Sequence, residues 1–220
     1  MARPAPSRTP ATSTRGFFAG LSKVVASSAR SPFISRPGTT LYRVLSIRAG
    51  ENRVKQPYFH MDLEAIHLLL PGTLPEEIRK MNTAAERSGN PSKVDAGGHG
   101  KGERVSWRVK VHGEWEAIHL ANIKNAAETI LEILGVDGFE DYDDEKWDEA
   151  IFGDDGMAGE DQPAAGLLVV GTTDARISKK GEIFTTTAWT PGEDVALDLI
   201  EKGVLTRAAC GFEGDPEIAA

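Results

Sequence analysis

The chain has 220 residues, 40% of them apolar and 26% charged, and a formal net charge of −8. These values predict a globular protein with one domain and appendages, or with two small domains. The longest apolar runs are only strand-length, which excludes a membrane-spanning helix of about 18 residues or more. Cys210 is the single cysteine. It excludes an internal disulfide and a zinc site built on cysteines, and a cytoplasmic location is expected.

Charge is distributed unevenly along the chain. Residues 1–50 contain eight basic residues and no acid, whereas residues 137–161 contain twelve acids and one lysine. This asymmetry predicts a polyanion as partner of the basic end, although solvated flexible segments have the same composition. We expect residues 1–30 to form a flexible basic arm. An acid-free N-terminus rich in arginine and serine is also typical of a mitochondrial transit peptide, which gives the mitochondrial matrix as the alternative location.

In chain order, the first predicted elements are two strands. The turn signal Pro37-Gly38 precedes an apolar strand that ends near Arg48. Residues 56–67 alternate between apolar and polar side chains, which predicts a half-buried strand. Its apolar face carries Phe59, Met61, Leu63 and Ala65, and its polar face carries Tyr58, His60, Asp62 and Glu64.

Residues 68–103 interrupt this rhythm and form a long predicted insertion. A capping box from Thr73 to Glu76 predicts a short helix that ends near Glu86, and a flexible glycine-rich loop is expected after it. Alternation returns in RVSWRVKV, residues 104–111, which predicts a third strand. Its apolar face carries Val105, Trp107, Val109 and Val111, and its polar face carries Arg104, Ser106, Arg108 and Lys110.

The strongest helical pattern follows, from His119 to the stop signal Gly135. A second short helix is expected around Trp147, inside the acidic linker 137–161. Residues 166–191, GLLVVGTTDARISKKGEIFTTTAWTP, have the pattern of a β-hairpin. A second capping box, Thr190 to Glu193, predicts a last helix.

Three strands, a helix and two further strands follow the order of a five-stranded OB-type barrel. The predicted fold class is therefore mainly β with helices (α+β). A helix lies between strands 3 and 4, a long insertion between strands 2 and 3, and a short helix near the C-terminus. The predicted division is a basic flexible arm at 1–30, an OB-type barrel domain at 31–191, and a C-terminal helix with an acidic tail at 192–220.

Five stretches resemble, in this order, a family of small tailed-phage proteins encoded in replication modules. The stretches are SPFISRPGTTLYRVLSI, PYFHMDLEAI, GERVSWRVKV, NIKNAAETILEILGV and the hairpin sequence above, and they span residues 31–191. Members of this family look like OB-fold proteins and are presumed to bind single-stranded DNA. The resemblance implies sequence-independent binding of single-stranded DNA in phage replication or recombination. It also implies the cytoplasm of an infected bacterial host as the location, and phage replication or recombination proteins as further partners.

Single-strand binding requires a cationic track for phosphates and exposed aromatic side chains on which bases stack. Strand 104–111 supplies cations, and Trp107 is assigned to the core. Tyr58 is the leading stacking residue, followed by Tyr42 and then Trp189. The basic tip of the hairpin, around Gly181, is expected to fold over a bound strand, with an ordinary soluble turn as the alternative. The candidate binding residues are Tyr42, Arg43, Tyr58, Arg104, Arg108, Lys110, Arg176, Lys179, Lys180 and Trp189.

Two other functions are consistent with the sequence. Asp62 and Glu64 point the same way from one strand, and two such carboxylates can hold Mg²⁺ for a nuclease. Alternatively, the barrel binds another protein and the basic arm binds duplex DNA or RNA, which describes a structural or adaptor protein. The glycine cluster at 97–102 lacks the spacing of a phosphate-binding loop. The sequence has no recognisable pair of a catalytic nucleophile and its base. We therefore expect no catalytic residue, cofactor or metal.

Overall fold

A computed structural model of the protein describes residues 36–51, 57–89, 94–111, 113, 116–138, 144–152 and 162–212. The predicted basic arm, most of the acidic linker and the end of the acidic tail lie outside these residues. Within them, no helix is both long and apolar enough to cross a membrane. The elements, in chain order, are β1 (Gly38–Glu51), β2 (Pro57–Leu70), α1 (Pro75–Arg87), β3 (Arg104–Lys110), α2 (Glu116–Ile133), α3 (Asp144–Phe152), β4 (Leu168–Ile177), β5 (Ile183–Pro191), α4 (Glu193–Glu201) and α5 (Arg207–Cys210).

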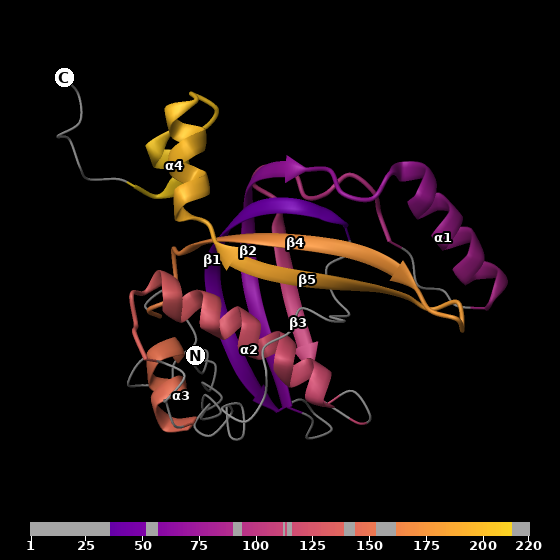
Figure 1. The fold of residues 1–220 in the computed structure, drawn as a ribbon, viewed down its shortest axis with the longest axis horizontal. Coiled ribbons are helices and arrows are strands. Elements are labelled where there is room, and N and C mark those ends of the chain that lie inside the picture. Colours follow the sequence, from indigo (N-terminus) through magenta and orange to yellow (C-terminus); the bar gives the residue numbers. More distant parts are fainter. Residues whose placement is uncertain are drawn as a thin grey trace, which may run out of the picture.

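The five strands form one antiparallel sheet in the order β3-β2-β1-β4-β5. Figure 1 shows β4 and β5 running across the direction of β1, β2 and β3, so the sheet bends strongly. The bend falls on β1, which pairs with β2 along its length but with β4 only from Gly38 to Arg43. A register shift between Val44 and Ser46 marks this point, as expected of a β-bulge.

The predicted α+β class, the strand count and the placement of the helices are confirmed, whereas a closed barrel is not. The sheet is open, with β3 and β5 as its two edges. Helix α2 packs against β5 and β3. Two of its side chains form hydrogen bonds with the backbone of one residue at the edge of β5. The amide of Trp189 donates to Asn125 Oδ1 (3.2 Å), and Thr129 Oγ1 donates to the Trp189 carbonyl (3.2 Å). The helix therefore takes the place that a neighbouring strand would have at this point of β5.

The main core lies between the bent sheet and helices α2 and α3. Phe59 and Trp107 are fully buried, as the alternation of β2 and β3 predicts. The Trp107 and Trp189 rings, from the two edge strands, meet edge to face with centroids 5.5 Å apart. A second apolar cluster, on the other side of β1 and β4, buries Leu41 against α4. At Leu41 and Tyr42 the central strand is thus buried on both faces.

Two local predictions are wrong. Neither capping box forms: the residues that precede α1 and α4 are Leu74 and Gly192, and neither gives a side-chain cap. Thr190 instead pairs within the sheet as part of β5, where ladder bonds replace the cap.

The glycine-rich loop, predicted as flexible, has specific contacts from residue 94 onward. His99 is buried against the Tyr42 ring at a centroid distance of 6.2 Å, and its Nδ1 lies 3.3 Å from Glu103 Oε1. Glu103 Oε2 accepts from the Gly100 amide (3.1 Å) and pairs with Arg36 (2.9 Å). These contacts hold the loop against the sheet.

Candidate functional site

The polar side chains of β1, β2 and β3 form one continuous surface opposite the main core, which we call the polar face. Its residues lie in rows across the three strands because the strand registers align them. The rows, read from β1 to β3, are Arg43–Glu64–Arg104, Ser46–Asp62–Ser106, Arg48–His60–Arg108 and Gly50–Tyr58–Lys110.

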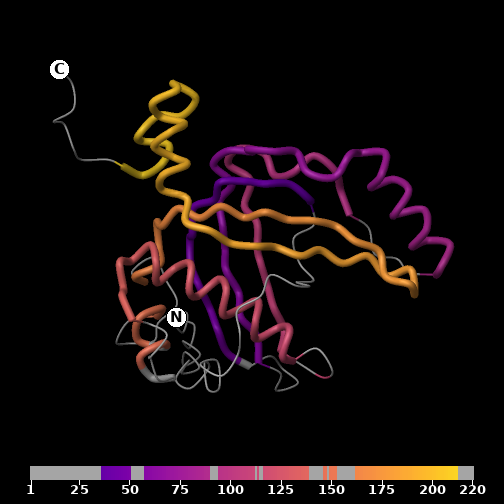
Figure 2. The backbone as a smooth tube through the Cα atoms, viewed as in Figure 1, coloured from indigo at the N-terminus to yellow at the C-terminus, as the bar shows by residue number. Residues whose placement is uncertain are grey.

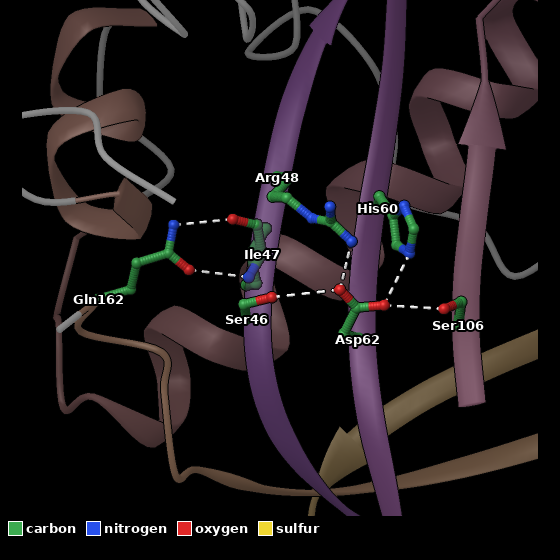
Figure 3. A network of polar contacts seen from close by, with 7 residues as sticks. All are labelled: Ser46, Ile47, Arg48, His60, Asp62, Ser106 and Gln162. Atoms are coloured by element: carbon green, nitrogen blue, oxygen red, sulfur yellow. Dashed lines mark hydrogen bonds and ion pairs between the residues drawn. The ribbon is translucent and has the colours of Figure 1, made fainter. Parts of the chain in front are cut away.

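Asp62 is the centre of a polar network on this face (Figure 3). Its Oδ1 accepts from Ser106 Oγ (2.8 Å) and lies 2.9 Å from His60 Nε2. Its Oδ2 accepts from Ser46 Oγ (3.3 Å) and pairs with the Arg48 guanidinium. Burial alone would raise the pKa of Asp62, but the Ser106 hydrogen bond and the charges of His60 and Arg48 hold it below the ordinary value. The carboxylate is thus kept ionised, with both oxygens already in contact with donors.

The second carboxylate of the face is also paired. Glu64 Oε2 accepts from Arg43 Nη1 (3.2 Å), and Arg43 Nη2 donates to the carbonyl of Ala209 in α5 (2.6 Å). Neither Asp62 nor Glu64 therefore presents a free pair of oxygens to a cation. Among the residues that the structure describes, no group of three His, Cys, Asp or Glu could hold a metal ion.

The cations of β3 differ from those of β1. Arg104, Arg108 and Lys110 have no ion-pair partner within the described part of the chain, and all three belong to the polar face. The Arg108 guanidinium lies over the ring of Tyr58, with Cζ 4.9 Å from the ring centroid. Tyr58 is half-buried and lies next to Lys110 in the register. This end of the face combines positive charge with a half-buried aromatic ring.

A groove of about 680 Å³ crosses the opposite end of the face. Arg43, Ser46 and Asp62 form part of its wall, with Arg104 and Ser106 on the β3 side and Gly166 beyond β1. It is an open depression with both charged and apolar walls, which connects β3 with the segment that enters β4.

Two of the predicted stacking residues lie in the core. Tyr42 is 1% and Trp189 3% exposed, and their rings contact each other at a centroid distance of 6.0 Å. Burial raises the pKa of Tyr42 to about 12. Both residues are therefore unavailable to a nucleobase, and the stacking role predicted for them is wrong. Trp107 is in the core, as predicted.

The hairpin tip does not join the polar face. Arg176, Lys179 and Lys180 are exposed, and Figures 1 and 2 show the tip beside the C-terminal end of α1, away from the C-terminal end of β1. Gly181 has a φ of +80°, and a Cβ atom built there would lie 2.3 Å from the Ser88 Cβ that follows α1. The tip thus packs closely on α1.

Several residues around Asp62 are absent from the predicted binding residues. Ser46, Arg48, His60 and Ser106 surround Asp62, and Gln162 bonds the backbone of the neighbouring Ile47 (Figure 3). The alternating pattern places His60 and Ser106 on polar faces, but only the register between strands identifies them as neighbours of Asp62.

The chain matches no family model and no curated protein. Its function is therefore inferred from the geometry and charge of the polar face.

Proposed function

We propose that the protein binds single-stranded nucleic acid, without sequence specificity, on the polar face of β1, β2 and β3. The observation that carries this proposal is the cluster of Tyr58, Arg108 and Lys110, in which a half-buried ring lies among cations that have no described ion-pair partner. Non-specific single-strand binders use this combination, because every base has a π-face and every nucleotide has a phosphate.

The order of the strands supports the same proposal. An OB-type barrel opened between its third and fifth strands has the pairing β3-β2-β1-β4-β5, and its helix follows the third strand. We infer that this protein is an OB-type variant in which α2 side chains bond part of the β5 edge. OB folds bind oligonucleotides on the surface of strands 2 and 3, which is the region of Tyr58, Arg108 and Lys110.

The paired state of the carboxylates favours binding over cleavage. A nuclease built on Asp62 and Glu64 would first have to release Arg48 and Arg43 from them. The resemblance to phage replication proteins makes phage DNA replication or recombination the proposed setting, with single-stranded DNA as the ligand.

The test is the affinity of the full chain for a labelled oligo-dT at several salt concentrations. We expect the association constant to fall with salt by about 0.7 log units per log unit for each phosphate neutralised. Equal affinity for a duplex of the same length would favour the adaptor function instead, and strand cleavage that requires Mg²⁺ would favour the nuclease.

Tyr58→Ala tests the stacking role. It should weaken oligo-dT binding by about 1–3 kcal/mol with little change in salt dependence, because stacking releases no counterions. The matched control is Tyr58→Phe, which keeps the ring and should bind as the wild type does. If the alanine variant binds like the wild type, Tyr58 takes no part in binding.

A further inference from the structure

The five cations of the polar face fall into two classes that lie on different strands. Arg43 and Arg48, on β1, are each paired with a carboxylate of β2, namely Glu64 and Asp62. The cations of β3 have no such partner in the described part of the chain. These cations of β3 are Arg104, Arg108 and Lys110.

This division decides which cations can attract phosphate. A phosphate that approaches Arg48 also approaches the Asp62 carboxylate bonded to it, so attraction and repulsion largely cancel. Arg43 is further engaged, because its second nitrogen donates to the Ala209 carbonyl. The charges on β3 are not cancelled by a bonded carboxylate, and a polyanion gains most by lying beside them.

The spacing along β3 suits an extended chain of phosphates. Alternate residues of a strand are about 6.7 Å apart and point to the same side, and successive phosphates of an extended nucleic acid strand have a similar separation. Arg108 and Lys110 are one such step apart, and Arg104 is two steps from Arg108. Ser106, between them, donates its hydroxyl to Asp62 (2.8 Å) and is not free to donate to a phosphate.

Tyr58 fixes the side on which the bases lie. It is on β2, opposite Lys110 in the register, and the Arg108 guanidinium lies over one face of its ring. A base stacked on Tyr58 would therefore have its phosphate over the last residues of β3.

We infer that the bound strand runs along β3, with its phosphates at Arg104, Arg108 and Lys110 and its bases directed over β2, and that the β1 arginines serve structure rather than binding. The inference rests on the proposed function and adds the path of the ligand. It implies that the face contributes about two log units of affinity per log unit of salt.

The experiment compares salt dependences of oligo-dT binding for variants of the full chain. Arg104→Gln, Arg108→Gln and Lys110→Gln should each reduce the slope by about 0.7. Arg108→Lys keeps the charge and should restore the slope. The charge-neutral control is Arg48→Gln combined with Asp62→Asn, which removes a cation and its carboxylate together and should leave the slope unchanged.

The outcomes separate the two proposals. Absence of salt-dependent binding by the wild type would overturn the proposed function and this inference with it. Binding by the wild type, with slopes that fall for the double variant on β1 and β2 but not for the β3 variants, would overturn only the inferred path. Urea denaturation of each variant confirms that the comparison is made between folded proteins.

Discussion

Gln162 offers a sharp test of how the edge of β1 is held beside the polar face. Its side-chain amide bonds both backbone groups of Ile47: Oε1 accepts from the amide at 2.8 Å, and Nε2 donates to the carbonyl at 2.7 Å. Ile47 is fully buried and Gln162 is 5% exposed. One side chain thus satisfies two groups that a neighbouring strand would otherwise have satisfied, next to Arg48 on the polar face.

Gln162→Ala should destabilise the protein substantially. Each buried backbone group left without a partner costs about 1–3 kcal/mol, so the two together predict a loss of about 2–6 kcal/mol. Water that enters the space left by the side chain would bring the loss toward the lower limit of this range, about 2 kcal/mol. Gln162→Glu keeps the volume but places an oxygen against the Ile47 carbonyl, and it should be no more stable than the alanine variant at pH 7.

The matched control is Asn82→Ala, which removes an equivalent pair of side-chain hydrogen bonds to the backbone of another residue. Asn82 binds the amide and carbonyl of Val94, at 3.0 and 2.8 Å, but it is only partly buried. Water can replace its amide, and we expect a loss of about 1 kcal/mol. The assay is the urea midpoint at unchanged m-value. If Gln162→Ala costs no more than Asn82→Ala, burial does not determine the cost of losing such a pair of hydrogen bonds.

Three further predictions concern the core, pH and the hairpin. Gly171→Ala should cost about 1–3 kcal/mol in urea denaturation, because its Cβ would lie 2.8 Å from the Trp189 ring, whereas Gly100→Ala, with open space around it, should be nearly neutral. Burial lowers the pKa of both His60 and His99, so the unfolded state binds more protons than the folded state below pH 6.5. The free energy of unfolding should therefore fall as the pH drops from 6.5 toward 5. Replacing both histidines with Gln should reduce this pH dependence, and an unchanged pH dependence would contradict the prediction. Replacing the three cations of the hairpin tip with Ser should change stability by less than about 1 kcal/mol and leave the salt dependence of oligo-dT binding unchanged, because the tip lies beside α1 and not on the polar face.

The faces of β2 and β3 could be read from the sequence because each strand has one buried and one polar side. Strict alternation from Tyr58 to Glu64 places every second residue in the core, and the structure agrees. The same alternation does not identify the buried face of β1, because this strand has a hydrophobic cluster on each side. Leu41 and Tyr42 are both buried, on opposite faces, so the apolar pattern no longer separates core from surface.

The burial of the inner face of β5 could not be predicted from its composition. Thr185 and Thr187 are buried alongside Trp189, and the Thr187 hydroxyl lies 3.0 Å from that of Thr173 across the sheet. Threonine on alternate positions resembles a solvated face in sequence, although this face of β5 is buried and carries Trp189. The network around Asp62 could not be predicted either, because Ser106 is 44 residues away and only strand register makes the two neighbours.

The edges of the sheet connect its stability with its proposed ligand. An unpaired strand edge invites association with another strand unless something covers or charges it. At Ile47 the cover is the Gln162 amide, and at Trp189 it is α2, so two edge positions are closed by side chains. The other outer edge of the sheet, β3, instead carries Arg104, Arg108 and Lys110. Two copies brought together along β3 would repel each other through these cations, whereas a chain of phosphates would neutralise them. The same three charges therefore discourage pairing with another copy and favour a polyanion at this edge.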